Sequence, residues 1–273
     1  AELGIKIINL FENEKIKPDV ILFLGDSNSV LASVPLRKQG YKIGHIEACM
    51  RSYDDRMFEE INRKACDHVS HILFAYHENY KIKGVKENIN KNKIHVVGNT
   101  IVEPLNKIAD LDYKNKKEHI ILDIHRPENF NDHERLFKII NFANLCSERY
   151  QKPILMLDFK RTLSEIKKAN IDLNKIEVIP LMGYKNFIRS MQNSMFLISD
   201  SGTAQEEPAL LKVPVIVPRD FTERPESMEN NCSFLYSLNN SSKAFEWIEK
   251  ENPIQTKWLG CGQTSERILN FLT

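Results

Sequence analysis

The chain has 273 residues, of which 42% are hydrophobic and 27% are charged, and its formal net charge is +1. This is enough material for one large or two ordinary globular domains, and the balance of acids and bases argues against a nucleic-acid binder. No apolar run approaches the roughly 20 residues that span a bilayer, and the cysteines form no CxxC pair, so we expect free thiols and a cytoplasmic location.

The chain opens in a helical pattern over residues 3–15 with no preceding strand, so we expect the natural sequence to continue upstream of Ala1. Strands are predicted near 20–24, 42–46, 71–75, 94–97, 119–124, 153–157, 176–179, 195–199 and 213–217. Helices are predicted near 29–39, 55–68, 79–88, 132–149, 162–168, 184–193, 204–211 and 243–250. This alternation predicts parallel sheets that are covered by helices on both faces.

The alternation pauses at 102–118, a polar stretch that follows a helical turn. We place a domain boundary there, which gives an N-terminal Rossmann-like domain of residues 1–112 and a C-terminal one of residues 113–273. The tail from Asn239 predicts helices without further strands, and the last helix is expected to pack back on the first domain.

Open parallel sheets bind ligands beyond the carboxyl ends of their strands, because loops and free N–H groups converge there. Five predicted strands end in polar, acid-rich or glycine-containing turns, more than loop composition alone would suggest. These turns are GDSNS, EACMRS, HRPENF, DSGTAQEE and PRDFTERPE.

The first two turns place Asp26 and Glu47 after successive strands. The next helix carries Glu59 and Arg63 one turn apart, so it could aim Glu59 at the same cleft. Carboxylates that share a cleft raise one another's pKa, which is the condition for acid–base chemistry near neutrality. The alternatives are a solvated i,i+4 pair and, for Asp26, a plain helix N-cap.

The spacing of Met57, Ile61 and Ala65 predicts the core stripe of this helix. Asp54, Asp55 and Arg56 are expected to form its solvated start. For Glu60 the sequence favours neither the solvated face nor the catalytic one.

The turn after 119–124 puts His125 beside Arg126, a cation pair that suits a departing diphosphate. A structural histidine and a local ion pair between Arg126 and Glu128 are the alternatives.

In DSGTAQEE, small residues precede a predicted helix, so hydroxyls and N–H groups could hold a phosphate while Glu207 reaches a sugar diol. An ordinary N-cap with first-turn acids is as good an interpretation of this turn. The sequence has no HExxH, zinc-type Cys/His cluster, GxSxG or Walker A motif, so no metal site is predicted.

With these motifs in order, the chain resembles the non-hydrolysing UDP-N-acetylglucosamine 2-epimerases, a bacterial and archaeal family. Seven segments resemble family motifs in the family's order and approximate spacing, from near Pro18 to about Asn230. They are GDSNS, HIEACMRS, FEEINR, VVGNTIVE, IHRPENF, SDSGTAQEE and PRDFTERPE.

The resemblance implies a GT-B architecture, in which two Rossmann-like, doubly wound parallel-sheet domains hold a nucleotide sugar in the cleft between them. It also implies that the C2 proton of a UDP-2-acetamido sugar is removed as UDP leaves. UDP then returns to the 2-acetamidoglucal with the opposite configuration at C2, without NAD or a metal. We expect a homodimer that makes precursors of surface polysaccharide.

Carried over by motif, Asp26, Glu47 and Glu59 resemble the acid–base carboxylates, with Arg63 close by, and His125 resembles the residue that steadies the UDP leaving group. The other implied contacts to the nucleotide sugar are Phe187 at the uracil and Ser201, Gly202, Thr203, Glu207 and Arg224 at the phosphates and ribose.

The chain departs from the family pattern at three places. It lacks the strand and GTRPE-like phosphate loop with which the family begins, so several strands of the first sheet are expected to be absent. Phe159 in FKRT stands where the family tends to carry a histidine, and Cys49 and Met50 replace a small-apolar pair. Epimerases of other UDP-2-acetamido sugars, a hydrolysing epimerase, a GT-B glycosyltransferase and a catalytically silent UDP-sugar binder stay open as alternatives.

Overall fold

The computed structural model describes residues 2–54, 56–109 and 114–273, and the chain divides into two compact units. Unit 1 comprises Ala1–Thr100 and Trp258–Thr273, and unit 2 comprises Ile101–Lys257. The boundary predicted at 112/113 lies outside the described residues. The chain passes between the units at Thr100 and again at Lys257, and the tail therefore belongs to unit 1.

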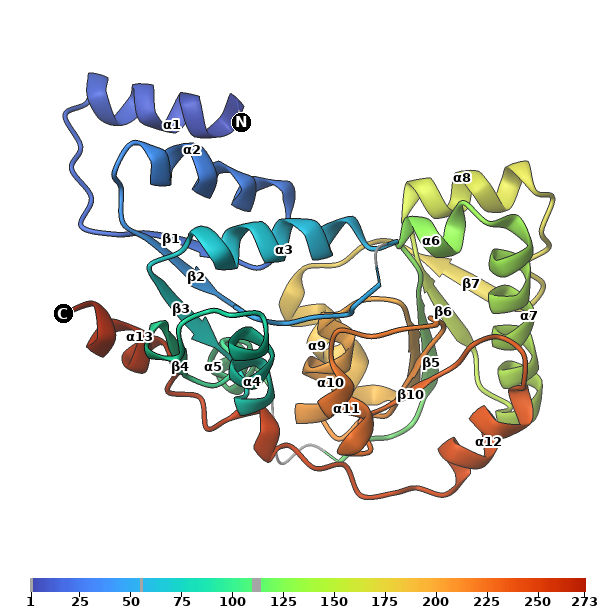
Figure 1. The fold of residues 1–273 in the computed structure, drawn as a ribbon. Helices are drawn as coiled ribbons and strands as arrows, with labels where there is room; N and C mark the ends of the chain where they lie inside the picture. Colours follow the sequence, from blue (N-terminus) through green and yellow to red (C-terminus); the bar gives the residue numbers. More distant parts are fainter. Residues whose placement is uncertain (1, 55, 110–113) are drawn as a thin grey trace. The chain divides into compact units, whose positions relative to one another are not determined.

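Unit 1 is built on a parallel four-stranded sheet in the order β1-β2-β3-β4 (Figure 1). The strands are β1 (Ile21–Leu24), β2 (Ile43–Ile46), β3 (Ile72–Ala75) and β4 (Ile94–Val96). The described helices are α1 (Glu2–Asn13), α2 (Ser33–Lys38), α3 (Phe58–Val69), α4 (Glu78–Lys86) and α13 (Thr264–Leu272), with 3-10 turns η1 (Asn28–Ala32), η2 (Lys91–Lys93) and η4 (Lys257–Leu259).

Both faces of strand β3 are covered. Leu73 and Ala75 pack in a cluster with Tyr80 of α4, whereas Phe74 packs with Ile268 of α13. Because successive strand residues point to opposite faces, a strand that is apolar throughout needs cover on both sides. The C-terminal helix supplies part of that cover in unit 1.

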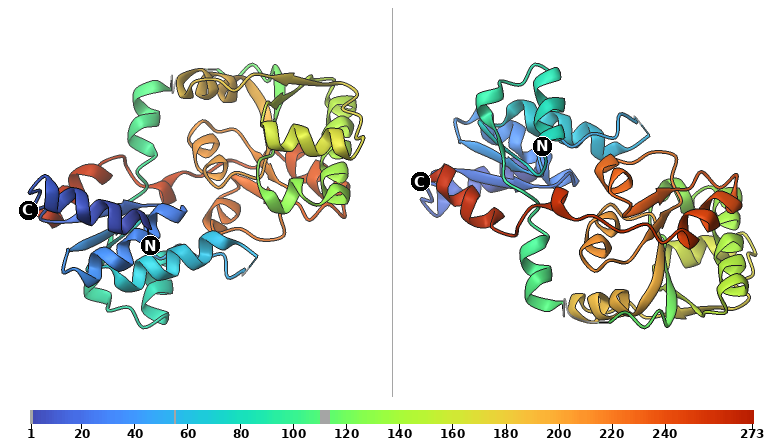
Figure 2. Two further views of the ribbon diagram at one scale, coloured as in Figure 1. Left: turned by 90° about the horizontal axis from the view of Figure 1, so that it is seen from above. Right: turned by 90° about the horizontal axis from the view of Figure 1, so that it is seen from below.

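Unit 2 is built on a parallel six-stranded sheet in the order β10-β9-β8-β5-β6-β7. Figure 2 shows the ribbon of this unit from two further sides. The strands are β5 (His119–Asp123), β6 (Ile154–Leu157), β7 (Ile176–Ile179), β8 (Ser194–Ser199), β9 (Val215–Val217) and β10 (Ser233–Leu235). The described helices are α5 (Val102–Ile108), α6 (Pro127–Phe130), α7 (His133–Tyr150), α8 (Lys160–Lys168), α9 (Tyr184–Asn193), α10 (Glu207–Leu210), α11 (Pro225–Glu229) and α12 (Ser241–Glu249), with the 3-10 turn η3 (Thr203–Gln205).

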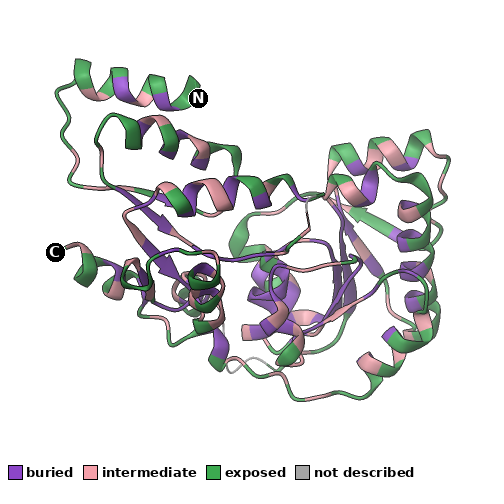
Figure 3. Cartoon of the chain, viewed as in Figure 1, coloured by how far each residue is buried: buried purple, intermediate pink, exposed green. Residues whose placement is uncertain are grey.

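Helix α7 illustrates how the sequence builds this unit. Leu136, Ile139, Ile140 and Ala143 recur at three- and four-residue spacing and join the cluster on one face of the sheet. Asp132 caps the helix by accepting the N–H of Arg135 at 3.0 Å. Figure 3 shows the outcome, with buried residues along α7 interrupted by exposed ones.

Every strand predicted from the apolar runs is present, with ends that differ by at most two residues. The sequence missed β10, which is only three residues long, and it missed helix α5 inside the stretch interpreted as polar. Of the helices in the described residues, none is both long enough and apolar enough to cross a membrane.

Candidate active site

In unit 1, the carboxyl ends of two neighbouring strands carry two of the predicted carboxylates. β1 and β2 pair in parallel with Leu24 beside Ile46, so Asp26 and Glu47 follow adjacent strand ends. Glu47 Oε2 lies 4.0 Å from the position that a Cβ on Gly25 would occupy. Glu47 itself has φ 70°, a left-handed conformation that costs a non-glycine residue roughly 1–2 kcal/mol. The structure thus places both loops at one edge of the sheet.

Arg63 of α3 ties Asp26 to the interior of unit 1. Its Nη2 forms an ion pair with Asp26 Oδ2, and its Nη1 lies 2.9 Å from Glu60 Oε2. Glu60 also accepts the backbone N–H and the hydroxyl of Ser52, each at 3.0 Å. Arg63 and Glu60 are fully buried, so loss of either would leave an uncompensated charge in the core.

The buried face of α3 differs from the predicted core stripe. Met57 is buried as expected, but Ile61 is 59% exposed, whereas Glu60, Arg63 and Asp67 are buried. The apolar spacing misidentified this face because charged side chains that pair inside the protein give no hydrophobic signal.

Glu59, the third predicted carboxylate, is half-buried in the first turn of α3. Within α3, Arg63 forms an ion pair with Glu60. The sequence alone favours neither the solvated face nor the catalytic one for Glu60. Before the helix, Arg56 is exposed and binds Asp54 at 2.6 Å, and Asp55 lies outside the described residues.

A buried ionic network fixes the backbone of the two strand-end loops. His45 of β2 contacts Asp67 through Nδ1 and the carbonyl oxygen of Gly25 through Nε2, both at 2.7 Å. Because a carboxylate and a carbonyl only accept, both ring nitrogens donate and His45 is an imidazolium. Burial by itself lowers the pKa of His45, but the hydrogen bond and charge of Asp67 raise it well above its usual value. Asp67 also accepts the N–H of Cys49 at 3.0 Å and lies 2.7 Å from Nη1 of Arg51.

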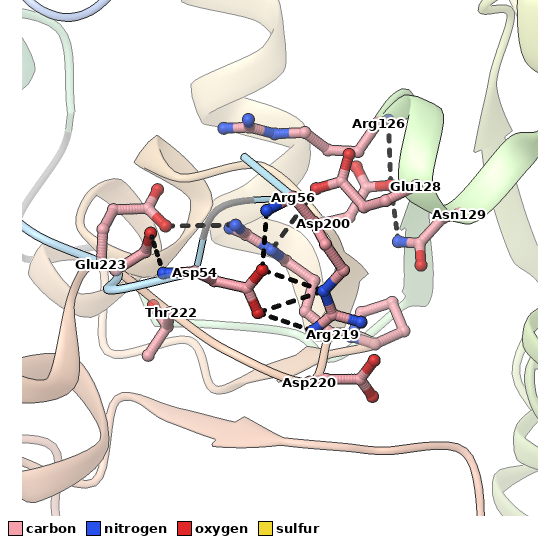
Figure 4. Close-up of polar contacts among 12 residues, drawn as sticks. Asp54, Arg56, Arg126, Glu128, Asn129, Asp200, Arg219, Asp220, Thr222 and Glu223 are labelled. Carbon is pink, nitrogen blue, oxygen red and sulfur yellow. Dashed lines mark hydrogen bonds and ion pairs between the residues drawn. The ribbon is translucent and has the colours of Figure 1, made fainter. Parts of the chain in front are cut away.

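In unit 2, β5 ends in the loop that carries His125 and Arg126. Asp200, which follows the neighbouring strand β8, is fully buried and accepts the backbone N–H groups of both residues at 3.0 Å. It also accepts Nδ2 of Asn129 at 2.9 Å (Figure 4). The sequence assigned no role to Asp200, because an acid in a strand-end turn gives no sign of the loop to which it binds.

The His125 side chain is held by a second carboxylate that the sequence did not single out. Its Nδ1 lies 2.9 Å from Oδ1 of Asp123, the last residue of β5. Burial lowers the pKa of His125, but the hydrogen bond and charge of Asp123, helped by the charge of Asp200, raise it above its usual value. The side chain of His125 is 33% exposed.

The turn after β8 packs tightly against the turn after β9. A Cβ on Gly202 would lie 2.5 Å from Nη1 of Arg224 and 2.8 Å from Glu223, so glycine permits this approach. Arg224 is buried and forms ion pairs with Glu223 at 2.5 Å and with Glu206 at 2.8 Å. The same Glu223 lies 3.2 Å from Arg219 (Figure 4).

The helix predicted over 204–211 is divided into η3 and α10, which have three and four residues. Elements this short have little helix dipole, so hydroxyls and backbone N–H groups are the candidate anion contacts. The hydroxyls of Ser201 and Thr203 lie 3.2 Å apart. Burial raises the pKa of Glu207, and a hydrogen bond from Tyr184 partly offsets that increase.

Phe187, the predicted uracil contact, is half-buried on α9 and packs against an apolar cluster that includes Leu197. Within the described ranges, no three His, Cys, Asp or Glu side chains group closely enough to hold a metal ion.

Comparison with known proteins places these features in a family. Residues 4–273 match the family model described as UDP-N-acetylglucosamine 2-epimerase. The chain is 36% identical to a UDP-N-acetylglucosamine 2-epimerase of Methanocaldococcus jannaschii, over 97% of this chain and 79% of that protein. It is 31% identical to a UDP-2,3-diacetamido-2,3-dideoxy-D-glucuronate 2-epimerase of Pseudomonas aeruginosa, over 94% of this chain and 75% of that protein.

Solved structures of similar fold belong to the same family. The M. jannaschii UDP-GlcNAc 2-epimerase in complex with UDP-GlcNAc and UDP has a TM-score of 0.88 at 35% identity, covering 99% of this chain and 79% of that chain. The Neisseria meningitidis UDP-GlcNAc 2-epimerase bound to UDP-GlcNAc has a TM-score of 0.85 at 26% identity, covering 99% and 80%. These structures confirm the GT-B-like α/β fold class predicted from the sequence. The chain belongs to the UDP-N-acetylglucosamine 2-epimerase family of isomerases.

Proposed function

We propose that this protein inverts C2 of a UDP-2-acetamido sugar, converting UDP-N-acetylglucosamine to UDP-N-acetylmannosamine without hydrolysis, for surface polysaccharide precursors. The observation that carries the proposal is the convergence of Asp26 and Glu47 at neighbouring strand ends, with Arg63 buried beneath Asp26. Support for the substrate class comes from the similar epimerases of M. jannaschii and N. meningitidis, whose structures were solved with UDP-GlcNAc bound.

The proposed reaction moves one proton and one leaving group. A carboxylate takes the C2 proton while the C1–O bond breaks. The electron pair of the C1–O bond leaves with UDP, and the C2–H pair forms the double bond of a 2-acetamidoglucal. A second carboxylate returns a proton to the opposite face as UDP adds back to C1. Asp26, Glu47 and Glu59 are the candidates for these proton transfers, and neither NAD nor a metal takes part.

We assign the candidate site residues of unit 2 to the binding of UDP. His125 steadies the departing diphosphate, because a charged N–H stabilises developing negative charge. The remaining assigned contacts are Phe187, Ser201, Gly202, Thr203, Glu207 and Arg224. We further propose that the protein acts as a homodimer in the cytoplasm.

Exchange at C2 tests this function. Full-length protein incubated with UDP-N-acetylglucosamine in heavy water should place deuterium at C2, and NMR should show a mixture of two UDP-sugars without free sugar. Asp26→Asn and Glu47→Gln should each slow exchange by at least about 100-fold. Glu12→Gln on the exposed side of α1 is the matched control and should not change the rate. Absence of C2 exchange with the folded wild type would refute the proposal.

The same experiment separates the alternatives. A hydrolysing epimerase would release UDP and free N-acetylmannosamine irreversibly. A glycosyltransferase would transfer sugar only to an acceptor and leave the C2 hydrogen in place. A silent binder would bind UDP in calorimetry without any turnover.

A further inference from the structure

A carboxylate stands behind His125 in unit 2, on the opposite side of the imidazole from Nε2. Asp123 is 4% exposed and uses both of its oxygens: Oδ1 faces Nδ1 of His125 at 2.9 Å, and Oδ2 accepts the hydroxyl of Ser199 at 2.7 Å. Since the carboxylate only accepts, Nδ1 carries a proton. Among the hydrogen bonds of the described residues, none engages Nε2, which leaves that nitrogen for a ligand.

The other neighbours of His125 restrict the ring further. Phe159, at the N-terminus of α8, lies with its ring centroid 4.9 Å from that of the imidazole. Asp200 holds the backbone N–H of His125, and its Oδ1 lies 3.6 Å from Nδ1. The charges that act on the ring are therefore Asp123 and Asp200, which favour the imidazolium, and the adjacent Arg126, which opposes it.

We propose that Asp123 is a positioning residue for the reaction: it fixes the His125 ring with Nε2 outward and keeps the ring an imidazolium that meets the departing diphosphate. This inference rests on the proposed elimination of UDP. Asp123 does not touch the substrate, and no covalent bond to His125 forms or breaks. The imidazolium donates a charge-assisted hydrogen bond to a phosphate oxygen as the C1–O electron pair moves onto UDP.

A purely structural role makes a different prediction. Asp123 also joins β5 to β8 through Ser199, so its loss could simply weaken the sheet. A structural defect would reduce activity at every pH. Loss of the positioning role would reduce activity only where the His125 ring has lost its proton.

The first test is an NMR titration of the histidine rings in the full-length protein, with the His125 signal assigned by its loss in His125→Asn. In the wild type, His125 should titrate above the usual value of about 6.5. In Asp123→Asn its pKa should fall by about one unit or more, because a neighbouring charge shifts a pKa by that amount. Asp172→Asn, the same change at an exposed turn, is the control and should leave the titration unaltered.

The second test is the pH profile of C2 exchange. Asp123→Asn should move the alkaline limb of kcat to lower pH by the same interval as the NMR titration, with recovery of activity on acidification and little change in KM. An unchanged titration, a wild-type His125 pKa at or below its usual value, or an equal loss of kcat at all pH values would overturn the inference. If Asp123→Asn does not fold, the wild-type titration remains as the test, and a His125 pKa at or below its usual value would overturn the inference.

The two proposals can fail separately. If the wild type shows no C2 exchange, the proposed function fails, and calorimetry of UDP binding over the same pH range replaces kcat. The affinity of Asp123→Asn for UDP should then weaken at a lower pH than that of the wild type. Identical pH dependence of the two affinities would overturn the role of Asp123.

Discussion

Whether a carboxylate lies beside the ring sets the direction of the pKa change at three buried or part-buried histidines. His45 is enclosed and uses both nitrogens as donors because Asp67 and a carbonyl surround it. His125 uses one nitrogen toward Asp123 and is one-third exposed. His119 is also buried but has no carboxylate in hydrogen-bond contact among its described partners, and burial lowers its pKa. The sign of each pKa change thus follows from the acid that the fold brings alongside.

His45→Gln should reduce stability most at acidic to neutral pH. Because the folded state raises the pKa of His45, its contribution is complete below the unfolded value of about 6.5 and is lost as pH rises through the folded value. Near pH 6 the loss should be about 3 kcal/mol, typical of removing one partner of a buried pair. Urea unfolding of both proteins between pH 5 and 9 measures it. A deficit that increases with pH would contradict the assignment.

Gly202→Ala should disturb the turn that faces Arg224. The added methyl group would lie 2.5 Å from Arg224 Nη1, so we expect a loss of about 1–3 kcal/mol in unfolding free energy and weaker UDP binding. Gly183→Ala is the matched control, because nothing lies within 4 Å of its Cβ position, and it should stay within about 0.5 kcal/mol of the wild type. Chemical denaturation and calorimetry with UDP give the two quantities. Equal behaviour of the two variants would show that the turn relaxes freely.

At the scale of single elements, α3 is a helix whose inner face is largely ionic. Glu60, Arg63 and Asp67 are buried on it, while Phe58 and Ile61 are 78% and 59% exposed. Asp26, on the loop after β1, pairs with Arg63, and His45 of β2 pairs with Asp67. The helix therefore docks through matched charges, which stabilise only when every partner is present.

Substitutions at two adjacent positions of α3 should distinguish its buried charged residues from its exposed apolar ones. Glu60→Ala should cost about 3–5 kcal/mol, because it leaves Arg63 buried with one counter-charge fewer. Ile61→Ala should cost no more than about 0.5 kcal/mol, as for other exposed positions. Guanidinium unfolding of the two variants gives the comparison. A larger effect at Ile61 would restore the core stripe predicted from the sequence.

The elements differ in how far the sequence could predict them. Strands buried on both faces are apolar runs, so β5 and β8 were located within a residue of their true ends. Asp26 and Glu47 could be placed together because parallel strand ends share one edge of a sheet. Asp67 could not, because its partners His45 and Arg51 lie on other parts of the chain. Asp123 could not, because an acid at a strand end is usually solvated. The ionic face of α3 was missed for the same reason.

At the scale of the whole molecule, the two units differ in continuity. Unit 2 is one uninterrupted stretch, Ile101–Lys257, whereas unit 1 needs Trp258–Thr273 as well. The tail is bound into unit 1 by specific contacts. Leu259 accepts the N–H of Asn99 at 2.9 Å, Arg267 donates to the carbonyl of Val97 at 2.8 Å, and Ile268 is buried against Phe74.

Removal of residues 258–273 should therefore weaken unit 1 selectively. Burial of Ile268 and the two hydrogen bonds together account for more than about 3 kcal/mol. Hydrogen exchange read by mass spectrometry should show faster exchange in β3 and β4 and unchanged protection in β5 and β8. The exposed Leu269 provides a control, since Leu269→Ala should leave all four strands protected. Equal loss of protection in both units would contradict this division.

The return of the tail to unit 1 also sets the order in which a ribosome can finish the two halves. Residues 101–257 can close their sheet as soon as Lys257 has left the exit tunnel, because every strand of that unit has then been made. The earlier sheet, which bears Asp26 and Glu47, gains the cover over Phe74 only when α13, whose last residue is Leu272, has also been made. The half of the molecule that is translated first is the half that is completed last.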